Sequence, residues 1–181
     1  MPIPDMSPHH LQRAWQSAAR CDALMTPEES MRAYRHDPAW SNGIAMARFD
    51  NGAGDHVIGF FTAEGKAVLK GFDHESELSP HAQDEYAVWP GIYDGLPQEL
   101  LDLLHHEAVD HEDVTFCCWS VDGVSWSTGT AQIAENMEDG AGWLLPMVQM
   151  DAQQFIEWAK HYYGDQFGKI GEAGLLAAFE K

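Results

Sequence analysis

The spacing of apolar residues changes along this chain, and the change divides it into helical and extended segments. Near the N-terminus, Ser7-Pro8 is typical of a helix start, because serine caps the first turn and proline already has the backbone angle needed there. This spacing predicts a helix that ends at about Met25. Its apolar residues recur at near-helical intervals, at Leu11, Trp15, Ala18 and Leu24.

A second helix start follows at Thr26-Pro27-Glu28-Glu29, which combines a threonine cap, a proline in the first turn and a glutamate three residues after the cap. Asp37-Pro38 and Ser41-Asn42-Gly43 are turn sequences that would end this helix. The sequence therefore predicts a second, shorter helix after the first.

The period then becomes that of β-strands. Apolar runs at 44–49, 57–62 and 66–72 are separated by Asn51-Gly52 and by Ala63-Glu64-Gly65, and both of these sequences suit tight turns. Three short strands joined by such turns predict an antiparallel meander.

A further hairpin is predicted around Asp122-Gly123. The run 114–121 is apolar at nearly every position, which is typical of a strand covered on both faces. A two-residue turn at Asp122-Gly123 would place Trp119 opposite Trp126 on one face of the sheet. Such a pair serves either as core packing, which we favour, or as an aromatic binding platform.

The remaining segments complete an α+β pattern. Residues 73–95 read as a long connection rich in turn sequences, and Pro97 then opens a leucine-rich central helix. Asp151 and Gln154 form a capping box for a last long helix that Gly164 ends, and residues 175–179 suggest a short terminal helix. The fold class predicted is α+β, with an antiparallel sheet of about five strands (meander plus hairpin) packed with N-terminal, central and C-terminal helices.

The composition is that of one globular domain spanning residues 1–181. Hydrophobic residues make up 45% of the 181 residues and aromatic residues 11%, which is enough to build a core without disulfides or metal. The three cysteines, Cys21, Cys117 and Cys118, have the spacing of neither a disulfide framework nor a zinc motif. Because residues 1–10 contain no apolar run, we expect no signal peptide and a cytoplasmic location.

The net charge of the chain favours some kinds of binding partner and disfavours others. The chain has 10 lysines and arginines against 29 aspartates and glutamates, for a net charge of −19. Nucleic acids and anionic membrane surfaces would be repelled, since both are bound through basic residues. A cationic partner is favoured, most simply a basic protein, although solubility alone would also explain the acidity.

Two clusters of ionisable residues offer candidate chemistry. The segment 105–113 would place His106 and Asp110 on one helical face, where an imidazole and a carboxylate could bind a divalent ion, or it is simply a solvated helix end. Asp73-His74-Glu75-Ser76, with His81 nearby, combines the groups of a general base without the turn of an activated serine. We predict no catalytic residue, metal site or cofactor, and we keep a metal-dependent or acid–base hydrolase as the alternative.

The loop Trp89-Pro90-Gly91-Ile92-Tyr93 is the strongest candidate for a protein interface. Tryptophan and tyrosine in a rigid turn often supply the main binding energy of an interface, and the alternative is that Trp89 closes the sheet edge as part of the core. Together with the acidic residues that precede this loop, the predicted partner contacts are Asp73, Glu75, Trp89 and Tyr93.

An ordered series of motifs resembles a group of small bacterial proteins of unassigned function. The series runs through Gly71-Phe72-Asp73-His74-Glu75-Ser76, Trp89-Pro90-Gly91, Gly95-Leu96-Pro97, Thr115-Phe116-Cys117-Cys118-Trp119 and Trp126. The resemblance implies a bacterial cytoplasmic protein, and small acidic proteins of this kind include many immunity proteins that neutralise toxins. Our leading hypothesis is therefore an acidic binding protein for a basic partner, in its narrower form an immunity protein. A structural or regulatory module is a third hypothesis, and the sequence makes no prediction of oligomeric state.

Overall fold

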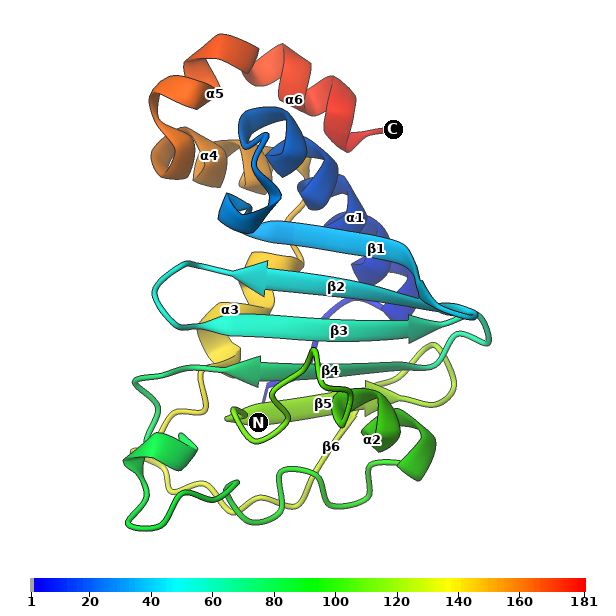
Figure 1. The fold of residues 1–181 in the computed structure, drawn as a ribbon, viewed down its shortest axis with the longest axis vertical. Helices are drawn as coiled ribbons and strands as arrows, with labels where there is room; N and C mark the ends of the chain where they lie inside the picture. The colour runs from blue at the N-terminus through cyan, green and yellow to red at the C-terminus, as the bar shows by residue number, and fades with distance from the viewer. Residues whose placement is uncertain (1) are drawn as a thin grey trace.

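A six-stranded antiparallel sheet forms the centre of the computed structural model, which describes residues 2–181 (Figure 1). Every strand pairs with the next one along the chain, so the sheet is a continuous meander in the order β1 to β6. The fold class is α+β, as predicted, with one strand more than the five expected. The strands are β1 (Tyr34–Ser41), β2 (Ile44–Asp50), β3 (His56–Thr62), β4 (Ala67–Phe72), β5 (Phe116–Ser120) and β6 (Ser127–Thr128).

Helices cover the two faces of the sheet unequally. One face packs against α1 and the helices after the sheet, through buried residues such as Trp15, Leu144 and Phe155. The other face is covered by α2 and by the long connection after β4, with Ile92 and Leu100 in its core. The helices are α1 (Pro8–Met25), α2 (Gln98–Leu104), α3 (Ala141–Val148), α4 (Ala152–Tyr163), α5 (Asp165–Ile170) and α6 (Glu172–Phe179), with 3-10 turns at Glu29–Met31 and Pro80–Ala82.

Strand β5 lies between the two cores, as its continuous apolar sequence predicted. Phe116 and Cys118 point into the core under α1, and Cys117 and Trp119 point into the core under α2. The two adjacent cysteines thus occupy opposite faces, because side chains alternate along a strand. Burial raises the pKa of both thiols, so neither is a reactive thiolate at neutral pH.

The prediction of a second helix before residue 37 was wrong, because that segment has a single 3-10 turn and then enters strand β1 at Tyr34. Only Glu29–Met31 is helical, as a single 3-10 turn. Asp37-Pro38 does not end the element, because β1 is an edge strand where a missing N–H costs no ladder hydrogen bond. Its register with β2 shifts between Asp37 and Ser41, where the Asp37 carboxylate accepts a hydrogen bond from the Ala39 N–H.

The hairpin after β5 does not have the predicted two-residue turn. Trp119 pairs with Ser127, so residues 120–126 form a wider loop in place of a tight turn at Asp122-Gly123. The Asp122 carboxylate accepts hydrogen bonds from the backbone N–H groups of Val124 and Ser125, which holds this wider loop closed. As a result Trp119 and Trp126 are not cross-strand neighbours: Trp119 lies in the core under α2, and Trp126 packs against the core under α1.

The C-terminal helix signals are confirmed. Asp151 and Gln154 form the capping box of α4, with each side chain accepting from the other residue's backbone N–H. Gly164 follows the last residue of α4, and the predicted terminal helix is present as α6. Among residues 2–181, none of the helices has the length and apolarity required to span a bilayer.

Candidate functional site

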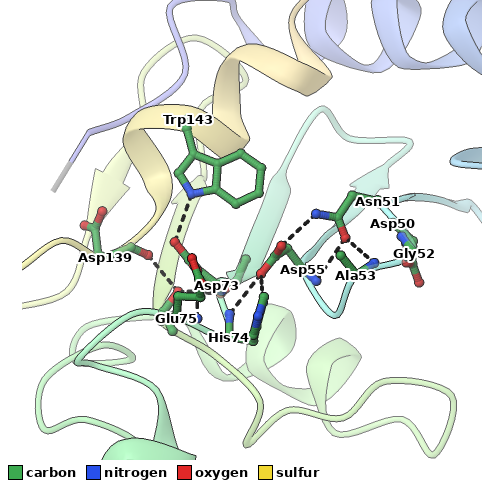
Figure 2. A network of polar contacts seen from close by, with 12 residues as sticks. Asp50, Asn51, Gly52, Ala53, Asp55, Asp73, His74, Glu75, Asp139 and Trp143 are labelled. Carbon is green, nitrogen blue, oxygen red and sulfur yellow. Dashed lines mark hydrogen bonds and ion pairs between the residues drawn. The ribbon is translucent and has the colours of Figure 1, made fainter. Parts of the chain in front are cut away.

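The register of β3 and β4 brings together acidic residues that lie far apart in the sequence. His56 at the start of β3 pairs with Phe72 at the end of β4. The residues just outside this pair, Asp55 and Asp73, therefore meet at the same end of the sheet. Figure 2 shows the polar network that results, with His74 between the two turns and Trp143 above Asp73.

Asp55 is buried and orients the exposed imidazole of His74. One carboxylate oxygen, Oδ1, accepts from both the His74 backbone N–H at 2.9 Å and the ring Nδ1 at 2.6 Å, and Oδ2 accepts from the Asn51 side-chain amide at 2.6 Å. Burial by itself would raise the pKa of Asp55, but these hydrogen bonds outweigh it and lower that pKa. The same hydrogen bond raises the pKa of His74 above its ordinary value of 6.5.

Asp73 links the end of β4 to helix α3. Its carboxylate accepts from the Glu75 backbone N–H at 3.0 Å and from the indole Nε1 of Trp143 at 2.8 Å (Figure 2). Gly140 precedes α3 with a φ of 79°, and a Cβ there would lie 2.4 Å from the Cβ of Asp73. Glycine at 140 therefore lets the start of α3 lie directly against Asp73, within reach of the Trp143 indole.

A hollow of about 520 Å³ lies beside Trp143. The Trp143 side chain is 40% exposed, and buried Asp139, whose pKa burial raises, forms part of the lining. The exposed residues Glu135 and Glu138 also line this hollow, with the apolar side chains of Ile133 and others. An indole face beside several carboxylates is an environment that suits a lysine or arginine side chain.

The same region holds the one group of three metal-ligating residues found among residues 2–181, namely Asp55, Asp73 and His74, whose ligand atoms lie within 4.8 Å of one another. Their ligand atoms are already engaged in internal hydrogen bonds. A metal ion bound through the His74 Nδ1 would have to displace the hydrogen bond of that nitrogen to Asp55. The arrangement is thus better explained as a self-satisfied polar network than as a metal centre.

The segment 105–113 is not the helical ligand face that its sequence suggested. Helix α2 ends at Leu104, so His106 and Asp110 do not lie one helical turn apart. The His106 Nδ1 accepts from the Ala108 N–H, which forms a local turn. After Leu104 the segment continues as a series of turns and bends, and the side chain of Lys70, fully buried on β4, donates to the carbonyls of Asp110 and Asp113 and ties this segment to the sheet.

Trp89 and Tyr93 are half-buried and attached to the core under α2. The Trp89 Nε1 donates to the Gln132 carbonyl at 3.3 Å, and the Tyr93 hydroxyl donates to the His111 carbonyl at 2.6 Å. Both rings therefore fix the long connection to its neighbouring loops. No hydrogen bond among residues 2–181 joins them to Asp73 or Glu75, so the four predicted contacts fall into two separate pairs.

Two exposed aromatic residues were missed at the sequence level. Trp143 stands beside Asp73, and Tyr86 is 49% exposed with its hydroxyl donating to Asp113 at 3.0 Å. Trp143 is the first large side chain after Asp139-Gly140, a sequence that could have indicated a helix start with an exposed first turn. Tyr86 lies in a stretch without periodicity, and nothing in the local sequence distinguishes it.

The chain matches no protein-family model, no curated protein and no solved structure with which it was compared. The fold by itself places the protein in the α+β class, with a six-stranded meander covered by helices on one face and by α2 and loops on the other. Function must therefore be argued from the site, because a fold class does not determine an activity.

We expect Asp55→Asn to destabilise the protein most at mildly acidic pH. Because the pKa of Asp55 is lower in the folded protein than its ordinary value of 3.8, this carboxylate stabilises the fold above pH 3.8. The stabilisation is lost as the pH falls through the pKa of Asp55 in the folded protein. Because the pKa of His74 is higher in the folded protein than its ordinary value of 6.5, this imidazole stabilises the fold below pH 6.5. The stabilisation is lost as the pH rises through the pKa of His74 in the folded protein. The substitution should therefore cost more stability at about pH 5.5 than at about pH 8.5, as measured by urea unfolding.

The NMR titration of His74 provides the direct readout. Its pKa should fall in Asp55→Asn, because the partner that stabilises the imidazolium is gone. Asp165→Asn is a matched control, since Asp165 is exposed on α5. An unchanged His74 pKa in Asp55→Asn would contradict the ion pair.

Proposed function

We propose that this protein is a binding protein that holds a basic protein partner on an acidic surface formed by the loops after β4 and β6. The observation that supports this proposal is the segregation of charge along the chain. Between Lys70 and Lys160 there is no lysine or arginine, and this stretch carries well over half of the 29 acidic residues. Its loops form the lower end of the molecule in Figure 1.

These loops share one continuous surface. The Ser76 hydroxyl donates to the Glu138 carbonyl at 2.7 Å, the Trp89 indole to the Gln132 carbonyl and the Thr130 hydroxyl to Asp94, so the connection after β4 contacts the connection after β6 at several places. Acidic residues from both connections thus act together, and their fields add. The exposed ones include Glu75, Glu77, Asp84, Glu85, Asp94, Glu107, Asp110, Glu112, Glu135 and Glu138.

The hollow beside Trp143 gives this surface a specific contact point. A lysine or arginine side chain of a partner entering it would meet the indole face and the carboxylates of Glu135 and Glu138. Glu75 lies on the same side, since Asp73 contacts both its backbone and Trp143 (Figure 2). In this proposal Asp73 and Glu75 act at the hollow, and Trp89 and Tyr93 act at the neighbouring edge of the same surface.

The test compares two triple variants with the same change of charge. Glu75→Gln/Glu135→Gln/Glu138→Gln neutralises the proposed contact, and Glu64→Gln/Asp165→Asn/Glu180→Gln neutralises exposed acids elsewhere. Wild type and the two variants are immobilised on separate supports. Each support is incubated at low salt with lysate of the cells that produce the protein, and bound proteins are eluted with a salt gradient. We expect wild type to retain one basic protein in stoichiometric amount, at higher salt than the first triple variant by a wide margin.

The control triple should retain the same protein nearly as well as wild type, because local contacts dominate over the general field at physiological ionic strength. Retention of only diffuse basic proteins, or equal loss in both triple variants, would contradict the proposal. In that case the acidity would serve solubility.

The narrower form of the proposal is that the partner is a basic toxin, such as a nuclease, which the protein neutralises. Its support is the charge of the surface and the motifs noted in the sequence. The test is whether wild type inhibits the enzymatic activity of the captured partner at a one-to-one ratio, while the first triple variant does not. A captured partner with no activity to inhibit would contradict this form and leave the binding proposal standing.

An acid–base hydrolase is the second candidate, and the observation that favours it is the Asp55–His74 pair. A buried carboxylate that orients an exposed imidazole is the arrangement of a general base. The nearest serine in the sequence, Ser76, is buried and donates to the Glu138 carbonyl, so it is not placed as a nucleophile for His74. The pair by itself gives less support to this candidate than the surface charge gives to binding.

A further inference from the structure

A basic cavity stands apart from the acidic surface, at the outer edge of strand β1. Its volume is about 280 Å³, and its lining includes Arg20 of α1, Arg32 before β1, and Arg35 and His36 of β1. Three of the chain's few basic residues thus converge on one small cavity in a protein of net charge −19. Strand β1 is the uppermost strand in Figure 1, at the opposite end of the sheet from the acidic loops.

The three arginines are held in place by carbonyl groups and not by carboxylates. Arg20 donates to the Ala178 and Phe179 carbonyls and to the Ser17 hydroxyl, Arg32 to the carbonyls of Thr26 and Pro27, and Arg35 to that of Ser30. Within residues 2–181, the lysines and arginines that form ion pairs are Arg48, Lys66 and Lys160. The charges of the cavity arginines are therefore uncompensated by any acid within 4 Å.

This arrangement is unexpected for purely structural arginines. An acidic chain offers many carboxylates, and the one on the cavity lining, Glu29, is exposed and pairs with none of the three. Two buried nitrogens beside the cavity, Arg35 Nε and His36 Nε2, also lack a hydrogen-bond partner among the described residues. Buried polar groups normally have partners, so Arg35 and His36, which both line the cavity, keep unused hydrogen-bonding capacity.

We propose that this cavity binds a small phosphorylated compound through its phosphate group. A guanidinium presents paired N–H donors that match the oxygens of a phosphate. Three positive groups also match the double charge of a phosphate dianion better than the single charge of a monocarboxylate. The volume of about 280 Å³ suits a small molecule. Acidic residues at the far end of the sheet do not prevent binding, because fields are screened beyond about 8 Å at physiological ionic strength. This inference is independent of the proposed protein partner.

The experiment titrates full-length protein with inorganic phosphate and follows backbone amide resonances by NMR at constant ionic strength, with succinate as a dicarboxylate comparison. We expect saturable shifts confined to residues around Arg32, Arg35 and His36, with half-saturation below about 10 mM phosphate. Arg35→Gln should weaken binding by about tenfold or more, because it removes a fork whose Nε is unpaired. Arg35→Lys, which keeps the charge but loses the fork, should also bind more weakly than wild type.

Arg13→Gln is the matched control, since Arg13 is exposed on α1 and does not line the cavity. It should change phosphate affinity less than about twofold. No saturable shifts, equal weakening in Arg13→Gln, or succinate binding as tightly as phosphate would each overturn the proposal. Thermal unfolding of each variant verifies that loss of binding is not loss of fold.

Discussion

Gly71→Ala should destabilise the protein by about 3 kcal/mol or more, which is among the largest effects of any single methyl group in this fold. Gly71 lies on β4 and pairs with Phe116 of β5. A Cβ at position 71 would lie 2.0 Å from the ring of Phe116, which is fully buried under α1 and cannot move into solvent. Urea unfolding at neutral pH would measure the loss, provided that the slope of the transition is unchanged.

Two further variants separate this clash from a general effect of replacing glycine. Gly142→Ala adds a Cβ that meets nothing within 4 Å on helix α3, and it should stabilise the protein by about 0.5–1 kcal/mol. Phe116→Leu removes the ring atoms that the new methyl meets. The double variant Gly71→Ala/Phe116→Leu should therefore lose less unfolding free energy than the sum of the losses in the two single variants. A Gly71→Ala protein as stable as wild type would show that β4 and β5 are not packed as described.

Lys70→Met should release the segment 105–113 from the sheet. The buried Lys70 ammonium donates to the carbonyls of Asp110 and Asp113, and methionine fills a similar volume without any donor. Losing the hydrogen bond to each of these partly buried carbonyls costs about 1 kcal/mol, so opening of the segment becomes easier. We expect hydrogen exchange in 105–113 to accelerate by about tenfold or more, while the strands β2 and β3 keep their protection.

The stability difference between wild type and Lys70→Met should depend on pH in one direction. Burial lowers the pKa of Lys70 from 10.5 to about 8, so between these values the unfolded chain binds the proton more readily than the folded one. Wild type therefore gains stability relative to Lys70→Met as pH rises from about 8 towards 10. Lys66→Met is the control, since Lys66 is a surface residue paired with Glu99 at 2.6 Å. A stability difference that does not change over this pH range would contradict a buried ammonium at position 70.

The sequence was sufficient for elements whose signals are local. Helices α1 and α4 were predicted because their caps and the apolar residues on one face lie within a few turns of one another. The strands β2, β3 and β4 were predicted because each is a short apolar run bounded by turn residues. The opposite orientations of Cys117 and Cys118 follow from strand geometry alone and need no knowledge of the fold.

The elements that were missed depend on contacts between distant residues. Strand β1 contains a proline and reads as a helix end, and it becomes a strand because β2 supplies its hydrogen bonds. The turn at Asp122-Gly123 has the sequence of a tight hairpin, but packing of Trp119 and Trp126 into different cores requires a wider loop. In both cases tertiary packing outweighed a local preference worth about 1 kcal/mol.

For the acidic surface and the basic cavity too, some features follow from the sequence and others only from the tertiary structure. The sequence by itself determined that the chain is strongly acidic, that it has no lysine or arginine from 71 to 159, and that Asp73 and Glu75 lie in a long connection. Only the tertiary structure placed Asp55 and Trp143 beside Asp73 and gathered Arg20, Arg32 and Arg35 around one cavity. Composition fixes the total charge, whereas the register of the strands and the packing of helices on the sheet decide which charges come together.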